Sequence, residues 1–465
     1  MALAEASFTQ GSLMRHVSMM SFTASLGLMA VFVVDLIDII FISMLGQDAL
    51  AAAAGYASTV MFFASAVNIG LSVAAGALVS RAIGADNEVD AREFATSVAI
   101  ISVAVGIVLP ILALPNVHAI LGLLGAEGHV ADKAAQYLWI ILPTTMVSGL
   151  SMTAVAVLRA HGDGSRAMYP ALAGGAANGI LDPIFIFALG LGLPGAAWAT
   201  VAARFVTLAM ALYPAVKRYN AFTYIRPQCV GRDARAAMQI AVPAVLATVA
   251  TPVGTAIVTR EMAKYGTDAV AGMAIISRII PVVFSVVLAL SGAIGPIIGQ
   301  NYGARQMDRV KEAFFDALKF VGIYVLLAAA LLFAFREPIV GLFDATGMTR
   351  TLIVLFCGPL ALASFFNGAI FISNASFNNL GHPGYSTIIN WARHTLGTWP
   401  LAVAGGMIWG APGVLIGQAV GGVVFAGIAV ALGLRVIANP EEDLIPTGFK
   451  YQEDRIHTLC NRCGR

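Results

Sequence analysis

Two pairs of polar residues stand inside stretches that are otherwise apolar, and their oxygen atoms could bind a cation. The first pair is Asp35 and Asp38 in VVDLIDIIFISMLG, and the second is Asn178 and Asp182 in AANGILDPIFIF. Residues three or four apart share one face of a helix, so each pair presents its side chains together. Carboxylate and amide oxygens suit hard cations. Like charges held close in a low-dielectric site also favour uptake of a proton. The residues therefore predict a coupling-ion site for Na⁺ or H⁺.

Two neighbouring residues support this interpretation of the second pair. Pro183 lacks a backbone donor and kinks its helix, which frees carbonyl oxygens beside Asp182. Thr200, in the next apolar stretch, adds a hydroxyl. The predicted ion-coupling residues are Asp35, Asp38, Asn178, Asp182 and Thr200. The alternative is a hydrogen-bond network between helices, in which Asp35 pairs only with Asp38 or an arginine.

Several basic residues also fall inside apolar stretches. Arg278, Arg393 and His394 are candidates for a gating or counter-ion role, and a structural ion pair is the alternative. Arg260 and Lys319 lie near the ends of their stretches, where long side chains can reach the membrane interface. The terminal HTLCNRC, with Cys460 and Cys463, lacks a fourth metal ligand, so a solvated tail is favoured over a metal site.

The composition predicts a membrane protein. Of the 465 residues, 59% are apolar and 11% are charged, whereas soluble domains carry about a quarter charged residues. Twelve windows reach the roughly 20 apolar residues that a spanning helix needs. The net charge of +2 predicts no nucleic-acid partner. If the N-terminus is cytoplasmic, thirteen loop Lys and Arg residues lie inside and four outside. The positive-inside rule thus predicts a multi-pass protein of the plasma (inner) membrane with both termini in the cytoplasm.

The second half of the chain repeats part of the first half. The segment GLSVAAGALVSRAIGADNEVDARE (70–93) shares seven identities with ALSGAIGPIIGQNYGARQMDRVKE (289–312), at one constant offset and without a gap. We expect an all-α fold of twelve helices in two homologous six-helix lobes, related by a pseudo-two-fold along the membrane normal. The predicted units are an N-terminal lobe (1–218), a cytoplasmic loop (219–234), a C-terminal lobe (235–437) and a cytoplasmic tail (438–465).

The acids are not repeated. The positions that match Asp35 and Asp38 fall near Thr255 and Val258, and those that match Asp182 and Thr200 fall near Leu401 and Gln418. No HExxH, GxSxG or Walker A motif occurs, so we expect neither an enzyme nor an ATP-driven pump, and no cofactor beyond the coupling ion.

These residues resemble the multidrug and toxic compound extrusion (MATE) family over about residues 17–437. DLIDIIFISMLGQDALAA (35–52) looks like its first-span pattern, with Asp38 in the Asp position and Asp35 in place of an Asn. IGPIIGQNYGA (294–304) resembles its Gly-Gln-Asn-x-Gly-Ala turn, and ANGILDPIFIF with GAAWAT resembles its fifth and sixth spans.

The resemblance implies an outward- or inward-facing cavity between two lobes and export of organic cations in exchange for Na⁺ or H⁺. It also implies a first-lobe cation site at Asp38, Asn178, Asp182 and Thr200. One branch of the family uses second-lobe carboxylates on spans seven and ten, where this chain offers only Glu261, near the outer end, and Asn367. We expect a monomer with a small-molecule substrate in the lipid bilayer. The alternative is a lipid-linked sugar or lipid flippase of the same superfamily, with several cationic residues in its cavity.

Overall fold

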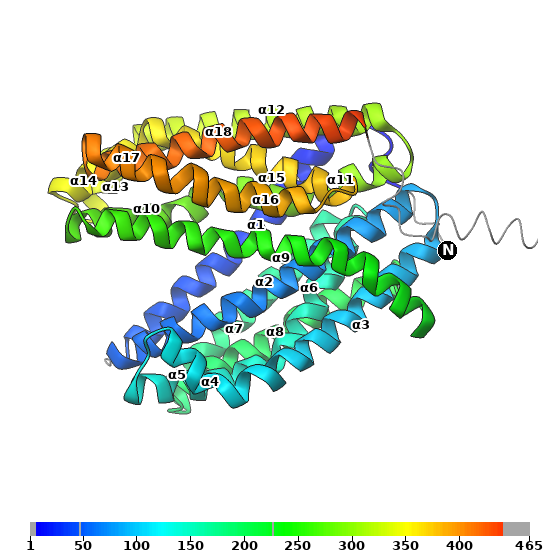
Figure 1. The fold of residues 1–465 in the computed structure, drawn as a ribbon. Coiled ribbons are helices and arrows are strands. Elements are labelled where there is room, and N and C mark those ends of the chain that lie inside the picture. The colour runs from blue at the N-terminus through cyan, green and yellow to red at the C-terminus, as the bar shows by residue number, and fades with distance from the viewer. Residues whose placement is uncertain (1–5, 46–47, 226, 440–465) are drawn as a thin grey trace, which may run out of the picture.

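The computed structural model describes residues 6–45, 48–225 and 227–439, and these residues are mostly helical and contain no strand (Figure 1). The predicted tail from residue 440 onward, with Cys460 and Cys463, lies outside the described residues. The first lobe consists of α1 (Leu13–Ser43), α2 (Asp48–Gly84), α3 (Glu88–Ala113), α4 (Val117–Leu123), α5 (Gly128–Ile141), α6 (Thr145–Ala160), α7 (Gly164–Pro183) and α8 (Leu193–Lys217). The second consists of α9 (Pro227–Ala263), α10 (Thr267–Val283), α11 (Ser285–Gly303), α12 (Met307–Ala334), α13 (Arg336–Leu342), α14 (Gly347–Cys357), α15 (Ala363–Asn379), α16 (Gly384–Ala392), α17 (Trp399–Trp409) and α18 (Ala411–Ala438).

Several of the crossings are built from two helices because proline interrupts them. Short 3-10 turns at η1 (Leu114–Asn116), η2 (Leu142–Thr144) and η4 (Pro359–Leu362) each contain a proline in their first turn. Proline removes one backbone donor and clashes with the preceding turn, so the helix bends or restarts there. Two π-helical turns, η3 (Ile184–Ala188) and η5 (Arg393–Thr398), continue α7 and α16.

The helices of the described residues run back and forth between the two ends of the bundle (Figure 1). In the described part of the chain, ten helical segments are long and apolar enough to span a membrane, and α10 with α11 forms an eleventh, bent by 50°. A further helical segment runs from α16 through η5 to α17 and contains Arg393 and His394, which lower its hydropathy. The predicted all-helical arrangement is confirmed.

Helix α1 belongs to both lobes. Leu13, Val17 and Met20, at its start, are buried in the hydrophobic core of the second lobe. Ile42, at its other end, is buried in a core of the first lobe. Figure 1 shows α1 running diagonally behind α9 from one lobe to the other. A change at one end of α1 therefore acts on both lobes.

The repeated segments pack against each other where the lobes converge. A Cβ at Gly84 of α2 would lie 2.0 Å from the backbone oxygen of Gln300 in α11. A Cβ at Gly303, the repeat partner of Gly84, would lie 2.1 Å from the backbone oxygen of Arg81. Arg81 and Gln300 also occupy matching positions of the two repeated segments, so the two contacts are related by the pseudo-two-fold. The repeat found in the sequence is thus the interface between the lobes.

The N-terminal segment crosses this interface and adds hydrogen bonds to it. The backbone N–H of Phe8 donates to Oε1 of Gln300 at 2.8 Å, and Nδ2 of Asn301 donates to the Phe8 carbonyl oxygen at 3.1 Å. Gln300 Nε2 in turn donates to the Ala160 carbonyl oxygen of the first lobe at 2.8 Å. We call this end of the bundle the closed end.

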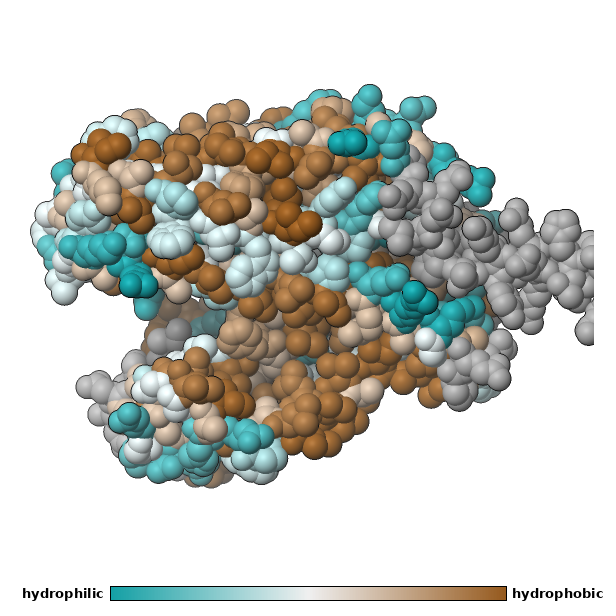
Figure 2. Space-filling view, viewed as in Figure 1, coloured by the Kyte–Doolittle hydropathy of each residue, from teal (hydrophilic) through white to brown (hydrophobic). Residues whose placement is uncertain are grey.

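At the opposite end, which we call the open end, the lobes diverge. Figure 2 shows a hollow between them on the side away from the N-terminus, and hydrophilic side chains gather at both ends of the bundle, with mainly apolar surface between the ends. Helices α2 and α9 face each other across this hollow, and they come close at Gly70, where a Cβ would lie 2.7 Å from the Ala241 carbonyl oxygen. The open end therefore gives access to a space between the lobes.

Candidate cation site and interlobe cavity

The structure brings Asp38, Asn178 and Asp182 together inside the first lobe. Nδ2 of Asn178 donates to Oδ1 of Asp38 at 2.8 Å and to Oδ2 of Asp182 at 2.6 Å. Asn178 and Asp182 are buried, and Asp38 is half-buried. The two carboxyl groups are also close enough to share a hydrogen bond when one is protonated. Both hydrogens of one amide thus bridge two acids from different helices.

Glycine in α7 explains how α1 comes close enough for this contact. A Cβ at Gly175 would lie 2.9 Å from Cγ2 of Val34. One helical turn later, on the same two helices, Asn178 meets Asp38. After Asp182, Pro183 ends α7 and the π-helical η3 begins. Single π-turns inside helices are often found at functional sites.

The acids carry more negative charge than the described residues around them neutralise. Asp38 and Asp182 bring two formal charges, and one neutral amide bridges them. Oδ1 of Asp182 is buried and has no hydrogen-bond donor in the described part of the chain. A buried charge is costly unless it is paired or hydrogen-bonded. An all-oxygen site with an open acceptor fits a small hard cation such as Na⁺, or a proton shared between the carboxylates.

Thr200 lies beside two residues that the sequence analysis did not assign to the site. Its hydroxyl donates to the Ala196 carbonyl oxygen at 3.0 Å, and the Tyr137 hydroxyl lies nearby. Arg204, one helical turn after Thr200, donates through Nη1 to Thr144 Oγ1 at 2.7 Å. No direct bond joins Thr200 to the acids among the described residues. Arg204 was visible in the sequence as a cation inside a span, whereas nothing local singled out Tyr137.

Asp35 does not join this cluster. It is exposed on α1 and has no hydrogen bond or ion pair in the described part of the chain, and it interacts with Asp38 only through space. The sequence analysis expected the two acids of the first span to face the site together. The structure instead places Asp38 against α7 and leaves Asp35 outside the hydrogen-bonded group.

The basic candidates lie in the second lobe, apart from the acids. Arg393 donates a hydrogen bond to the side-chain oxygen of Asn367. His394 is buried against Gly254 of α9, and its Nδ1 has no partner among the described residues. Arg278 is exposed on α10. The second lobe therefore holds basic side chains in its interior, but not at the positions that match the first-lobe acids, where it has Thr255, Val258 and Leu401.

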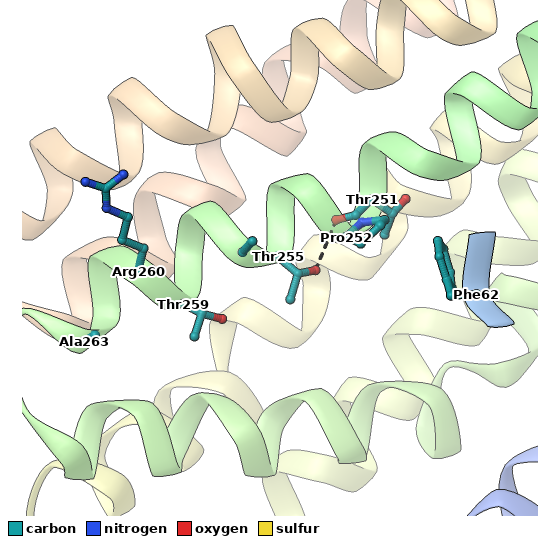
Figure 3. Close-up of a pocket in the computed structure, with 8 residues that line it drawn as sticks. Phe62, Thr251, Pro252, Thr255, Thr259, Arg260 and Ala263 are labelled. Carbon is teal, nitrogen blue, oxygen red and sulfur yellow. Dashed lines mark hydrogen bonds between the residues drawn. The ribbon is translucent and has the colours of Figure 1, made fainter. Parts of the chain in front are cut away.

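A cavity of about 740 Å³ lies between the lobes. Phe62 of α2 lines one side, and the other lining residues come from one face of α9 (Figure 3). These residues are Thr251, Pro252, Thr255, Ala256, Thr259, Arg260 and Ala263. The cavity is large enough for a drug-sized molecule, because ligand pockets commonly measure about 300–1,000 Å³.

Comparison with known proteins gives a consistent picture. The sequence model of the family described as MatE matches residues 24–184 and 243–403, two segments with the same offset as the repeat. A FAD transporter of Shewanella oneidensis is 30% identical over 416 residues, which covers 85% of this chain and 89% of that protein. The multidrug export protein MepA of Staphylococcus haemolyticus is 23% identical over 396 residues, which covers 84% and 86%.

Solved structures share the fold. A mutant of the Vibrio cholerae MATE transporter VcmN superposes with a TM-score of 0.87 at 25% identity, covering 93% of this chain and 98% of that chain. An outward-facing multidrug resistance MATE family transporter superposes with a TM-score of 0.86 at 23% identity, with the same coverage. Both similarities extend over both lobes.

Proposed function

Because this chain belongs to the MATE family of membrane transporters, we propose that it is a secondary active antiporter. It exports a small molecule in exchange for Na⁺ or H⁺, and the exchanged ion binds at Asp38, Asn178 and Asp182. The observation that carries this proposal is the pair of carboxylates joined through one amide, with one buried oxygen left without a donor.

Repulsion between the carboxylates of Asp38 and Asp182 favours binding of a cation at this site. Without a cation, two carboxylates face each other in a medium of low dielectric constant, and full ionisation is unfavourable. Entry of Na⁺ or H⁺ relieves this repulsion and favours closer packing of α1 on α7. Burial of a polar group without a partner is costly. A cation or proton that binds Asp182 Oδ1 removes this cost, which further favours binding of the ion.

Helix α1 provides a route from the ion to the rest of the protein. Asp38 lies near one end of α1, and the other end is buried in the core of the second lobe. A shift of α1 against α7 therefore changes the packing between lobes. If ion and substrate favour different arrangements, each must weaken the binding of the other by the same factor.

The charge distribution supports an orientation. The basic residues that predict cytoplasmic loops, such as Arg81 and Arg309, lie with Phe8 at the closed end. By the positive-inside rule we place this end in the cytoplasm, and the cavity then opens to the outside. The location in the plasma (inner) membrane and the cytoplasmic position of both termini are part of the proposal.

Two substrate classes are suggested by the relatives. The family resemblance and MepA favour organic cations or drugs, and the Shewanella relative favours FAD. The flippase alternative would need several cationic residues in the cavity, and Arg260 is the only one that lines it among the described residues. We therefore keep export of small soluble molecules as the proposed function. The monomeric state stays a prediction.

The test is transport by purified protein in liposomes, with an imposed Na⁺ or pH gradient in separate experiments. We expect Asp38→Asn to abolish gradient-driven export while the protein remains folded and inserted. Asp132→Asn, which removes an exposed carboxylate paired with His118, is the matched control and should transport normally. Full transport by the Asp38→Asn protein would rule out coupling at this site.

A further inference from the structure

One face of α9 presents a row of hydroxyl groups to the interlobe cavity. Thr251, Thr255 and Thr259 are spaced four residues apart, so they follow one side of the helix, and all three are exposed (Figure 3). The Thr255 hydroxyl donates to the Thr251 carbonyl oxygen at 3.2 Å. The hydroxyls of Thr251 and Thr259 have no hydrogen bond within the described part of the chain. Those two groups are free to donate to a ligand.

Arg260, at the open end of this row, carries a charge that no side chain in the described part of the protein pairs. It is exposed and makes no hydrogen bond or ion pair with any described residue. The adjacent acid, Glu261, points elsewhere and accepts from Nζ of Lys264 at 2.6 Å. Lys264 is therefore neutralised locally and Arg260 is not.

Among the described residues that line the cavity, no acid offsets this charge. Arg260 is the only ionisable residue among the eight that line the cavity, and neither Asp35 nor Asp38 lines it. An organic cation would enter against this charge. An anion would gain a charge-assisted hydrogen bond, and a guanidinium can bind a phosphate or carboxylate with two parallel bonds.

We propose that this cavity selects amphipathic organic anions: a flat aromatic body that packs on Phe62, Pro252 and Ala256, and a phosphate or carboxylate group that binds Arg260. Thr259 and Arg260 are adjacent on α9 and point in different directions (Figure 3), so we expect the Thr259 hydroxyl to bind a polar atom of the ligand other than the anionic group. This assignment of the substrate class rests on the proposed export function. One arginine suits a molecule with a single anionic group better than a lipid pyrophosphate, which would need several bases.

The test measures equilibrium binding to the full-length protein in detergent by isothermal titration calorimetry. Three probes separate charge from shape: riboflavin, riboflavin 5′-phosphate, which adds one phosphate to the same ring system, and ethidium, a flat aromatic cation. We expect the phosphate ester to bind about tenfold or more tightly than riboflavin, the size of effect that a hydrogen bond to a charged group produces. We expect ethidium to bind most weakly.

Variants then locate the effect. Arg260→Gln should lower affinity for the phosphate ester about tenfold or more and change riboflavin affinity little. Arg260→Lys should keep part of the preference, because the charge remains and the two-bond geometry is lost. Lys264→Gln is the matched control, since it removes the same charge one turn away along the chain. Retained riboflavin binding shows that each variant is folded.

Two results would overturn the anion assignment. One is equal binding of riboflavin and its phosphate, or preference for ethidium, by the unmodified protein. The other is an equal loss of phosphate-ester affinity in Lys264→Gln and Arg260→Gln, which would indicate a general surface potential. Export of ethidium that depends on a gradient and on Asp38 would refute this inference and leave the antiport proposal intact. If the protein prefers the phosphate ester but its transport depends on no gradient, the antiport proposal is refuted and the anion assignment stands.

Discussion

Adding one methyl group at Gly84 should force the lobes apart at the closed end. A Cβ there would lie 2.0 Å from the Gln300 backbone oxygen and 2.6 Å from its Cα, whereas ordinary contacts of a Cβ begin at 3.4 Å. The obstacle is backbone, which cannot rotate away as a side chain can. Gly84→Ala therefore requires a separation of at least about 1 Å between α2 and α11, or the loss of this packing.

The size of the effect follows from the cost of overpacking. Forcing an extra methyl group into a packed interface costs about 1–3 kcal/mol. The helix propensity gained from alanine applies in both arrangements and cancels in the difference between them. If the protein exchanges between states closed and open at this end, the population ratio should shift about 5- to 150-fold toward the open one.

Distances between spin labels can detect this shift. Val89 on α3 and Lys311 on α12 are exposed near the starts of their helices at the closed end, one in each lobe. With the native cysteines replaced by serine and labels at both positions, double electron–electron resonance should show a longer distance population in Gly84→Ala.

A nearby glycine provides the control. A Cβ at Gly76, two turns earlier on α2, would lie 3.9 Å from Cβ of Ala156, an ordinary contact. Gly76→Ala should leave the distances unchanged, and Gly303→Ala should reproduce the effect of Gly84→Ala because it meets the Arg81 backbone in the same way. Identical distances in Gly76→Ala and Gly84→Ala would refute the reasoning.

Three further predictions concern coupling, orientation and stability. Substrate affinity in detergent should fall as protons or Na⁺ are added, and Asp38→Asn should flatten this dependence; binding by the unmodified protein that ignores both ions would leave no coupling to explain. A membrane-impermeant thiol reagent should label Cys229 only from the cytoplasmic side, and labelling from outside intact cells would reverse the orientation. Asp163 caps α7 outside the spans. Burial raises the pKa of its carboxyl, but hydrogen bonds from Tyr219 and Arg166 outweigh burial and hold the pKa below its usual value. Its stabilisation is therefore present above the unfolded pKa of about 3.9 and is lost as the pH falls through the lower folded pKa. Asn caps a helix about as well as Asp, so Asp163→Asn should lose only the charge-assisted part of the bonds to Tyr219 and Arg166, about 1 kcal/mol at neutral pH. Thermal unfolding in detergent should show the difference shrinking in acid; an equal difference at both pH values would contradict this.

The sequence by itself determined the class of protein and the division of the fold. Long apolar segments need no tertiary information to be recognised, because a bilayer forces each one to satisfy its own backbone hydrogen bonds as a helix. The repeat was equally visible, and the two segments that match the family are offset from each other in the same way. Asn178 and Asp182 could be placed on one face because they lie on one helix, where geometry depends only on spacing.

Contacts between helices required the tertiary structure. The spacing of Asp35 and Asp38 was equally compatible with both acids facing the site, and only the approach of α1 to α7 at Gly175 decided that Asp38 enters and Asp35 does not. Tyr137 reaches Thr200 from α5, a helix distant in the chain, so no local pattern could reveal it.

The same limit applies to charge pairing and to the interface. Arg260 and Lys264 both lie within one helical turn of Glu261 in sequence, and the folded helix end decides that Lys264 takes the acid and Arg260 faces the cavity. The repeated glycines at positions 84 and 303 were recognisable as a motif, but their purpose appears only when each meets the backbone of the other lobe. The sequence determines what each helix presents along its length. Which faces meet is decided by the packing of all helices at once, because each contact depends on the positions of helices that are distant in the chain.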